Sequence, residues 1–317
     1  MSFVHDTTDF ADLVRIAAMA RDLEPALIEK DYWVTHALWA LHQTGLDIWF
    51  KGGTSLSKAY GIIERFSEDV DLRIEPGRAT NVPVVTSWKS INKGPIAQRA
   101  QFFEDLGHAM AIPGAQVLFQ PDTVDKDARG AHYHLMYPGH FLSSIRSGIR
   151  PYVLLEVGVA RVTPFVFRPI GSFVHDELER TGRLGDFDEN RPTAVRCVHP
   201  LVTLVEKLDA ISRRFRRDPM EPASFVRHYE DAARIIRALP SLPALDESPS
   251  QLIDDMLREK QIRWRPDASD PAFNPKAEEP KAVFAAYDAI AAMFWGERTS
   301  LTDACTAIRT WLTEIET

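Results

Sequence analysis

Two stretches near the N-terminus, residues 8–21 and residues 25–43, carry apolar side chains at helical spacing. Pro25 opens the second stretch and Gly45 follows it, as expected at the start and just after the end of a helix. The pattern therefore predicts two helices before residue 45.

The following segment changes from a strand pattern to a helix pattern. LDIWFKGG, residues 46–53, is short, apolar and closed by two glycines, which is typical of a buried strand. TSLSKAYGII, residues 54–63, returns to helical spacing, with Thr54 where a helix N-cap is expected. DVDLRI, residues 69–74, alternates polar and apolar residues, which indicates another strand.

Later patterns predict a sheet first and helices afterwards. Strands are expected at AQVLFQ, AHYHLMYP and RPYVLLEVGVA, residues 115–120, 131–138 and 150–160. A long loop over residues 76–100 should lead into a helix near residues 97–110. Strand signals fade after residue 170, and helical patterns cover residues 200–217, 224–239, 281–296 and 301–315. We therefore expect an α+β protein, with a mixed sheet in residues 1–190 and an α-helical domain in residues 191–317.

Composition narrows the class of protein. The chain has 317 residues, 45% of them hydrophobic, which is enough to build a substantial core. A formal net charge of −8 argues against a protein that coats nucleic acid by bulk electrostatics, so any such contact should rest on a local basic patch.

The cysteines and the N-terminus indicate the compartment. Cys197 and Cys305 are too few for a disulfide framework and lack metal-ligand spacing, so reduced thiols are expected. The first twenty residues include acids and no apolar run long enough for a signal peptide or a membrane span. We predict a cytoplasmic protein that does not enter a membrane.

Residues 51–74, KGGTSLSKAYGIIERFSEDVDLRI, concentrate the candidate chemistry. A Walker A loop would need a second glycine before Lys58 and a hydroxyl residue after it, and neither is present. An EF-hand loop beginning at Asp69 would need Asp or Asn in place of Arg73 and Gly in place of Ile74. Both motifs are excluded.

A carboxylate-bound metal explains the pattern better. Asp69 and Asp71 are two residues apart on a predicted strand, so their side chains project from one face. Mg²⁺, with Mn²⁺ as an alternative, prefers such oxygen ligands. Glu156 is the only acid in the apolar run VLLEVGV, where a buried carboxylate without a partner would be costly, so it is the candidate third ligand.

The glycine pair supplies a candidate nucleotide site. Gly52 and Gly53 are followed by Thr54, Ser55 and Ser57 where a strand should give way to a helix, and a helix N-terminus favours phosphate. Taken singly, these features also suit an ordinary turn and a solvated aspartate pair. Their order, a glycine pair, a helix, D-x-D and then a lone acid in a later strand, is the order of the polymerase β-like nucleotidyltransferase fold, which the chain resembles.

At a finer level the chain resembles the AbiEii toxin family of nucleotidyltransferases, whose relatives include the MenT toxins. The resemblance spans most of the chain and rests on blocks that follow the family's order: EKDYWVTHAL, KGGTSLSKAY with RFSEDVDL, LLEVGVA, EKLDAISRR and RHYEDAARI. By this resemblance, Gly53 and Ser55 match the family's phosphate-binding turn, and Lys58 matches the basic residue that follows it. Asp69, Asp71 and Glu156 match the metal-binding carboxylates. Lys207 and Asp231 match the site residues that the family places in its helical half. Glu230 stands where the family usually has an aromatic or hydrophobic residue.

Lys207 also has two explanations that do not depend on the resemblance. On its helix it could reach the triphosphate and stabilise charge on the departing pyrophosphate. It could instead form a surface salt bridge, for example with Asp231.

The resemblance implies transfer of a nucleoside monophosphate from an NTP to RNA, typically a tRNA 3′ end, by a toxin of a type IV-like toxin–antitoxin or phage-defence system. Blocked aminoacylation would then stop translation, and a neighbouring antitoxin would restrain the toxin. Two alternatives keep the site. A kinase-like enzyme would transfer the γ-phosphate to a protein serine such as Ser55 or Ser57, and a non-catalytic module would bind only nucleotide or antitoxin.

Three smaller groups of residues each have more than one possible role. His132, His134 and His140 have a spacing that could bind zinc, although exposed strand histidines or an RNA-contacting surface are the favoured interpretation. The acids and lysine of EKDYW, residues 29–33, are best explained by a salt bridge on a helix face, with a substrate role as the alternative. RRFRR, residues 213–217, could contact RNA phosphates or cap a helix end.

Overall fold

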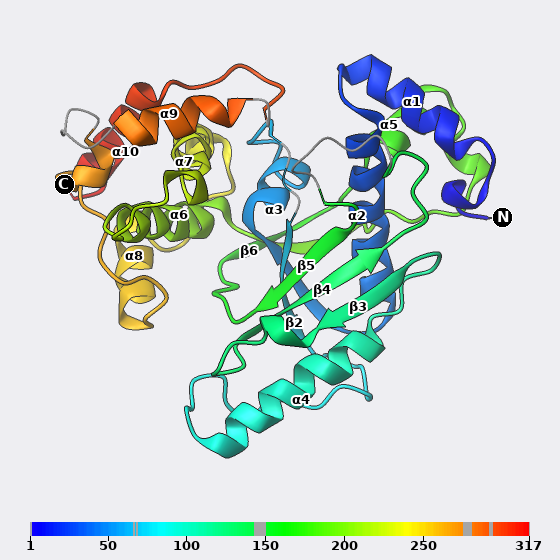
Figure 1. Ribbon diagram of the computed structural model, residues 1–317, viewed down its shortest axis with the longest axis horizontal. Helices are drawn as coiled ribbons and strands as arrows, with labels where there is room; N and C mark the ends of the chain where they lie inside the picture. Colours follow the sequence, from blue (N-terminus) through cyan, green and yellow to red (C-terminus); the bar gives the residue numbers. More distant parts are fainter. Residues whose placement is uncertain are drawn as a thin grey trace. The chain divides into compact units, whose positions relative to one another are not determined.

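The computed structural model describes residues 2–65, 67, 69–142, 150–274, 281–291 and 294–316 (Figure 1). The chain forms two compact units. The first contains residues 1–59, 67–159 and 167–197, and the second contains residues 60–66, 160–166 and 198–317. Two short segments of the N-terminal half thus belong to the helical unit. The predicted domain boundary at residue 190 remains a prediction.

The first unit contains the N-terminal helices and most of the sheet. Its helices are α1 (Phe10–Arg21), α2 (Pro25–Gln43), α3 (Gly52–Lys58), α4 (Lys93–Ala109) and α5 (Phe173–Arg180). Its strands are β1 (Asp47–Lys51), β2 (Asp69–Glu75), β3 (Gln116–Gln120), β4 (Gly130–Met136) and β5 (Val153–Gly158), while β6 (Phe165–Arg168) and β7 (Val195–Val198) lie where the chain passes between the units.

The strands of the described residues form one mixed, seven-stranded sheet in the order β3-β4-β5-β2-β1-β7-β6. β2 pairs with β1 in antiparallel and with β5 in parallel orientation, and β4 lies antiparallel to β5 and to β3. The predicted α+β class with a mixed sheet is confirmed. The sheet brings together, across three neighbouring strands, residues that are as far apart in sequence as Lys51 and Glu156.

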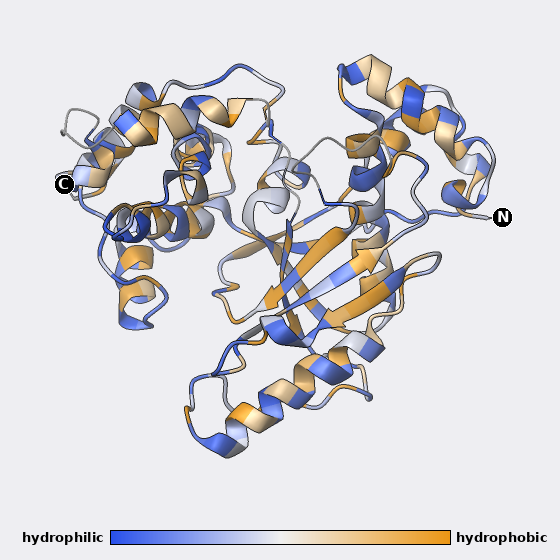
Figure 2. Cartoon of the chain, in the orientation of Figure 1, coloured by the Kyte–Doolittle hydropathy of each residue, from blue (hydrophilic) through white to orange (hydrophobic). Residues whose placement is uncertain are grey.

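One face of this sheet is covered by helices. Tyr133 and Leu135 on β4 are fully buried, and the Tyr133 hydroxyl donates to the backbone carbonyl of Phe103 on α4 at 2.7 Å. α4 packs against β3 and β4 and carries both hydrophilic and hydrophobic positions, as an amphipathic covering helix should (Figures 1 and 2). His132 and His134, on the other face of β4, are only half-buried. The alternation of exposure therefore defines a second, more open face of the sheet.

The predicted long loop before α4 is held by one buried cation. Arg99 is fully buried, and its guanidinium donates to the backbone carbonyls of Ser87, Ser90 and Asp127 at 2.5–3.1 Å. These carbonyl acceptors compensate for the cost of burying the charge. Arg99 therefore fixes the loop to the turn before β4.

The second unit is helical. It contains α6 (Pro200–Phe215), α7 (Arg227–Ala238), α8 (Pro249–Arg258), α9 (Lys281–Ala289) and α10 (Leu301–Glu316). α7 packs on both α6 and α10. No helix of the described residues is both long and apolar enough to cross a membrane.

Most elements expected from the sequence are present, and the differences have local causes. Thr54 does not cap α3, because that helix already begins at Gly52 with Lys51 at its N-cap. β6 and β7 have four residues each and α5 has eight, so each is too short to show a clear periodicity. Residues 292 and 293 of the predicted helix 281–296, and Phe66 and Glu68 of the RFSEDVDL block, lie outside the described residues.

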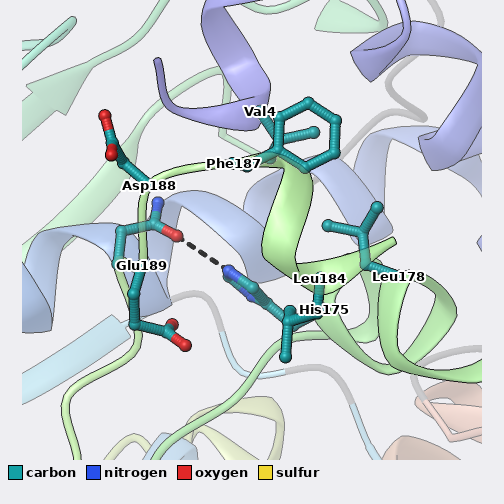
Figure 3. A pocket seen from close by; sticks show the side chains of 8 residues that line it. Val4, His175, Leu178, Leu184, Phe187, Asp188 and Glu189 are labelled. Carbon is teal, nitrogen blue, oxygen red and sulfur yellow. Dashed lines mark hydrogen bonds between the residues drawn. The ribbon is translucent and has the colours of Figure 1, made fainter. Parts of the chain in front are cut away.

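A buried polar network connects α2 to the segment after α5. The side-chain amide of Asn190 donates to the Tyr32 hydroxyl at 2.8 Å and lies 2.9 Å from Nδ1 of His36. Its oxygen lies 2.7 Å from Nε2 of His175 (Figure 3). The cavity beside His175 has a volume of about 10 Å³, room for about one water molecule. We therefore regard the network as structural.

The free energy of unfolding should fall as the pH drops from 6.5 towards 4. Burial lowers the pKa of His36 and of His175 from 6.5 to about 4, because it disfavours the charged imidazole. Between these values the unfolded chain binds more protons than the folded chain, so stability rises with pH. The two histidines together give a slope of up to about 2.7 kcal/mol per pH unit. Denaturant titrations between pH 4 and 7 measure it.

His175→Gln provides the control for this slope. The amide removes one titrating group and keeps a polar side chain facing Asn190, so the slope between pH 4 and 6.5 should fall by up to about 1.4 kcal/mol per pH unit. A variant with the full wild-type slope would show that His175 is not a source of the acid sensitivity.

Candidate active site

Four strands place polar side chains in one row across the open face of the sheet. Lys51 on β1 is the register partner of Asp71 on β2, Asp71 that of Glu156 on β5, and Glu156 that of His132 on β4. Partners in register project from the same face. The row therefore brings Asp71 and Glu156 side by side, as expected for two ligands of one site.

Asp69 lies on the same face, two residues before Asp71. Its Oδ1 accepts a hydrogen bond from Nη1 of Arg150 at 2.6 Å. Arg150 is not among the site residues predicted from the sequence. Its position as the first residue of the predicted strand RPYVLLEVGVA was the only sequence signal that could have indicated it.

Glu156 differs from its prediction in one respect. The sequence suggested a buried carboxylate without a partner, but the side chain is 36% exposed and its Oε1 lies 3.7 Å from Nε2 of His132. β5 reads as apolar because Leu154 is buried on the open face as well, while Val153 and Leu155 lie on the covered face. Glu156 is thus the polar position on a strand that is otherwise buried on both faces.

Asp69, Asp71 and Glu156 suit a divalent cation, both because of their oxygen ligands and because they lie on one face of neighbouring strands. They offer the oxygen ligands that Mg²⁺ prefers, and the like charges of Asp71 and Glu156 lie on neighbouring strands in register, which is unfavourable unless a cation compensates. Within the described part of the chain, no three Asp, Glu, His or Cys side chains are already gathered closely enough to hold a metal. Asp69 would have to exchange Arg150 for the cation.

The glycine pair is structurally coupled to this row. Gly52 has φ +72°, a left-handed conformation, and a Cβ added there would lie 2.6 Å from Cγ of Asp71 and closer still to its Oδ2. The Asp71 carboxylate therefore occupies the space that any other residue at position 52 would fill. This contact explains why α3 begins with a glycine.

Gly52→Ala is expected to displace Asp71 and to reduce activity strongly. The left-handed conformation alone costs about 1–2 kcal/mol for an alanine, and the collision with Asp71 adds to this. Gly61→Ala is the matched control, since Gly61 has φ +62° with nothing within 4 Å of an added Cβ. Activity and melting temperature should be measured for both. Equal losses of activity would mean that backbone strain, rather than the contact with Asp71, is responsible.

Three other predicted nucleotide-binding residues, Gly53, Thr54 and Ser55, are buried within the protein. The Thr54 hydroxyl donates to the backbone carbonyl of Asp69, which ties α3 to β2. Gly53 is buried, and Ser55 is only 2% exposed. Burial raises the pKa of the neighbouring Cys197 thiol to about 12 despite a hydrogen bond with Ser55, so this thiol is not a nucleophile. The depth of Ser55 also makes it a poor target for the kinase-like alternative.

Lys58 and the EKDYW residues form supporting contacts. The Lys58 ammonium pairs with the Asp31 carboxylate, which also accepts from the backbone N–H of Phe173 at 2.9 Å. Glu29 accepts from the backbone N–H groups of two residues after β4, and Lys30 donates to the carbonyl of Arg150 at 2.9 Å. The expected salt bridge on the helix face is replaced by a bridge to another helix, because Asp31 pairs with Lys58 on α3.

Lys207 on α6 and Asp231 on α7 lie in the second unit. Nζ of Lys207 is 2.7 Å from Oδ2 of Asp231, and the Arg65 guanidinium donates to both oxygens of the same carboxylate at 2.8 Å. The side chains of Lys207 and Asp231 are 8% and 0% exposed. The alternative of a salt bridge between them is confirmed, but the bridge is buried and not on the surface. Their predicted roles in the reaction remain predictions.

The electrostatics of this group favour an ionised carboxylate. Burial alone would raise the pKa of Asp231, but Arg65 and Lys207 more than offset it and hold the pKa far below its usual range. Burial also lowers the pKa of Lys207, although Asp231 opposes that shift. The adjacent Glu230 is fully buried as well and accepts from Arg298 Nε at 3.0 Å. An acid is therefore accommodated at a position where the resemblance predicted an aromatic or hydrophobic residue.

The basic cluster of residues 213–217 and the three histidines of the possible zinc site also have partners within the protein. Arg213 pairs with Asp209 at 3.4 Å and Arg216 with Asp270 at 3.0 Å, so part of the basic cluster is neutralised locally. The backbone N–H of His140 donates to Glu29. His132 faces Glu156, and no zinc-like set is assembled in the regions that the structure covers.

Comparison with known proteins identifies the family of the chain. Residues 36–312 match the family described as nucleotidyl transferase AbiEii toxin, type IV toxin–antitoxin system. Comparisons with curated proteins and with solved structures gave no significant match. The matched region contains every predicted site residue, from Gly52 to Asp231. The chain therefore belongs to the AbiEii family of nucleotidyl transferase toxins of type IV toxin–antitoxin systems.

Proposed function

We propose that this protein transfers a nucleoside monophosphate from an NTP to an RNA acceptor, with a tRNA 3′ end as the preferred acceptor, and thereby blocks translation. One observation carries the proposal: Asp71 and Glu156 are register partners, Asp69 shares their face, and Gly52 packs directly against Asp71. The glycine turn and the carboxylates thus meet at one point of the sheet, which supports a shared site for nucleotide and metal.

Asp69, Asp71 and Glu156 would hold Mg²⁺ or Mn²⁺. When bound, the metal supplies positive charge that activates the acceptor hydroxyl and compensates the charge of the leaving pyrophosphate. The turn at Gly52 and Gly53 positions the triphosphate. Arg150 is the cation displaced from Asp69 on metal binding, and its guanidinium is suited to contact a phosphate afterwards.

Lys207 and Asp231 are assigned supporting roles in the proposed reaction. Asp231 holds the Lys207 ammonium by a hydrogen bond of 2.7 Å in a buried setting, where the effect of a charge is stronger than in water. Lys207 contributes the positive charge that the family places in its helical half. We further propose a cytoplasmic location, a role in phage defence and control by an antitoxin encoded nearby.

The proposal is tested by metal removal. Incubation of the protein with total tRNA and an NTP labelled at the α-phosphate should label the RNA in the presence of Mg²⁺. Excess EDTA should abolish the labelling, and added Mg²⁺ or Mn²⁺ should restore it. Labelling that persists at full rate in EDTA would contradict the assigned carboxylate site.

A further inference from the structure

Asp69, Asp71 and Glu156, which we call the carboxylate row, lie on β2 and β5 in the middle of the sheet, with β1 on one side and β4 on the other. On one side, β1 leads into the glycine turn that packs against Asp71. On the other side, beyond Glu156 on β5, lies β4 with His132 and His134 on the same open face. A triphosphate bound at the glycine turn leaves the β4 side for the second substrate.

A stacked pair of rings occupies that side. The rings of His134 and Tyr152 lie 3.9 Å apart between centroids, with an interplanar angle of 20°. His134 is diagonal to Glu156 across the strand pair, and such positions lie about 7–8 Å apart. Both side chains are half-buried, so part of each ring remains accessible. We call His134 and Tyr152 the β4 platform.

We propose that the β4 platform stacks on the base of the terminal acceptor nucleotide and so positions its hydroxyl at the carboxylate row. This inference rests on the proposed function and names the acceptor's place within it. In the reaction, the acceptor hydroxyl oxygen bonds to the α-phosphorus, the α–β bridging P–O bond breaks, pyrophosphate leaves with that electron pair, and the hydroxyl proton passes to water.

The chemistry of the platform fits an unpaired RNA base. Aromatic rings bind the π-face of any base, which is how proteins hold single-stranded ends with little sequence preference. Gln120 and Leu118 on β3 are the register partners of His132 and His134, and they extend the face with a polar and an apolar side chain. Leu118 is 37% exposed. A flat, partly apolar surface at the edge of a polar site suits a base better than a phosphate.

Kinetics of ring-removing variants test the platform. Tyr152→Ala and His134→Ala should each raise KM for RNA by about 5- to 150-fold, the range of one lost stacking contact. KM for the NTP should stay within about 2-fold, because the triphosphate lies on the β1 side. Tyr152→Phe should restore KM for RNA, since it keeps the ring. His108→Ala is the control, because His108 is exposed on α4, which covers the opposite face.

Binding of a fluorescent, unpaired RNA tetranucleotide with a free 3′ hydroxyl gives a readout that does not depend on transfer. Weaker binding by both alanine variants, with Tyr152→Phe equal to wild type, supports the platform. An equal loss in Tyr152→Phe and Tyr152→Ala, or a rise in KM for the NTP instead of RNA, would overturn it. If the wild type binds the oligonucleotide through the platform but transfers no nucleotide, the proposed reaction fails and the binding site stands.

Discussion

Replacing Asp71 with asparagine is expected to lower the rate of nucleotidyl transfer by at least about 10²- to 10³-fold, the loss typical when a group that stabilises the transition state is removed. Asparagine keeps the shape that Gly52 accommodates and removes the charge that a cation needs. The variant should also relieve the like-charge pair with Glu156, so its melting temperature should change little.

The control for this prediction is Asp122→Asn, the same substitution at an exposed residue after β3. Transfer and growth inhibition should both be normal in that variant. Asp69→Asn should be as inactive as Asp71→Asn, because both carboxylates are assigned to the metal. Near-normal turnover of either site variant in a folded protein would refute the metal assignment.

Asp231→Asn is expected to destabilise the second unit by about 3–5 kcal/mol, the usual cost of removing one partner of a buried ion pair. The variant leaves Arg65 and Lys207 without the carboxylate that both contact. Lys207 can respond by losing its proton, whereas a guanidinium stays charged. Arg65 should therefore account for most of the cost.

Lys207→Met provides the comparison. It should cost less than Asp231→Asn, because Asp231 keeps both hydrogen bonds to Arg65. Arg258→Ala is the surface control in the same unit, since the Arg258–Asp255 pair on α8 is largely exposed and should contribute little. Equilibrium denaturation of the three variants measures the order. A loss for Asp231→Asn no larger than that for Arg258→Ala would show that the buried network does not stabilise the unit.

The sequence predicted features that depend on local spacing. The D-x-D spacing placed Asp69 and Asp71 on one face because the period of a strand is two, and the glycines marked the end of β1. Glu156 was identified as the lone acid of its strand. Its exposure could not be predicted, because the apolar neighbours of Glu156 are buried on both faces of the sheet.

Contacts between distant segments were missed for a different reason. Arg65 and Asp231 are 166 positions apart, and Arg150 and Asp69 are 81 positions apart, so no local pattern connects them. Likewise, the burial of Lys207 depends on packing within the helical unit, which helical periodicity alone does not reveal. The spacing of acids along the sequence thus predicted the candidate metal ligands. Their counter-ions, such as Arg150 beside Asp69, became visible only in the tertiary structure.

The central claim, transfer of an NMP from an NTP to RNA, is tested most directly by the fate of the two ends of the triphosphate. The wild-type protein and Asp71→Asn are incubated with total tRNA, Mg²⁺ and the same NTP labelled either at the α- or at the γ-phosphate. We expect the α-label on RNA, the γ-label released as pyrophosphate, and neither product with the variant. A γ-label on protein or RNA, with no α-label on RNA, would contradict the account and indicate a phosphotransferase.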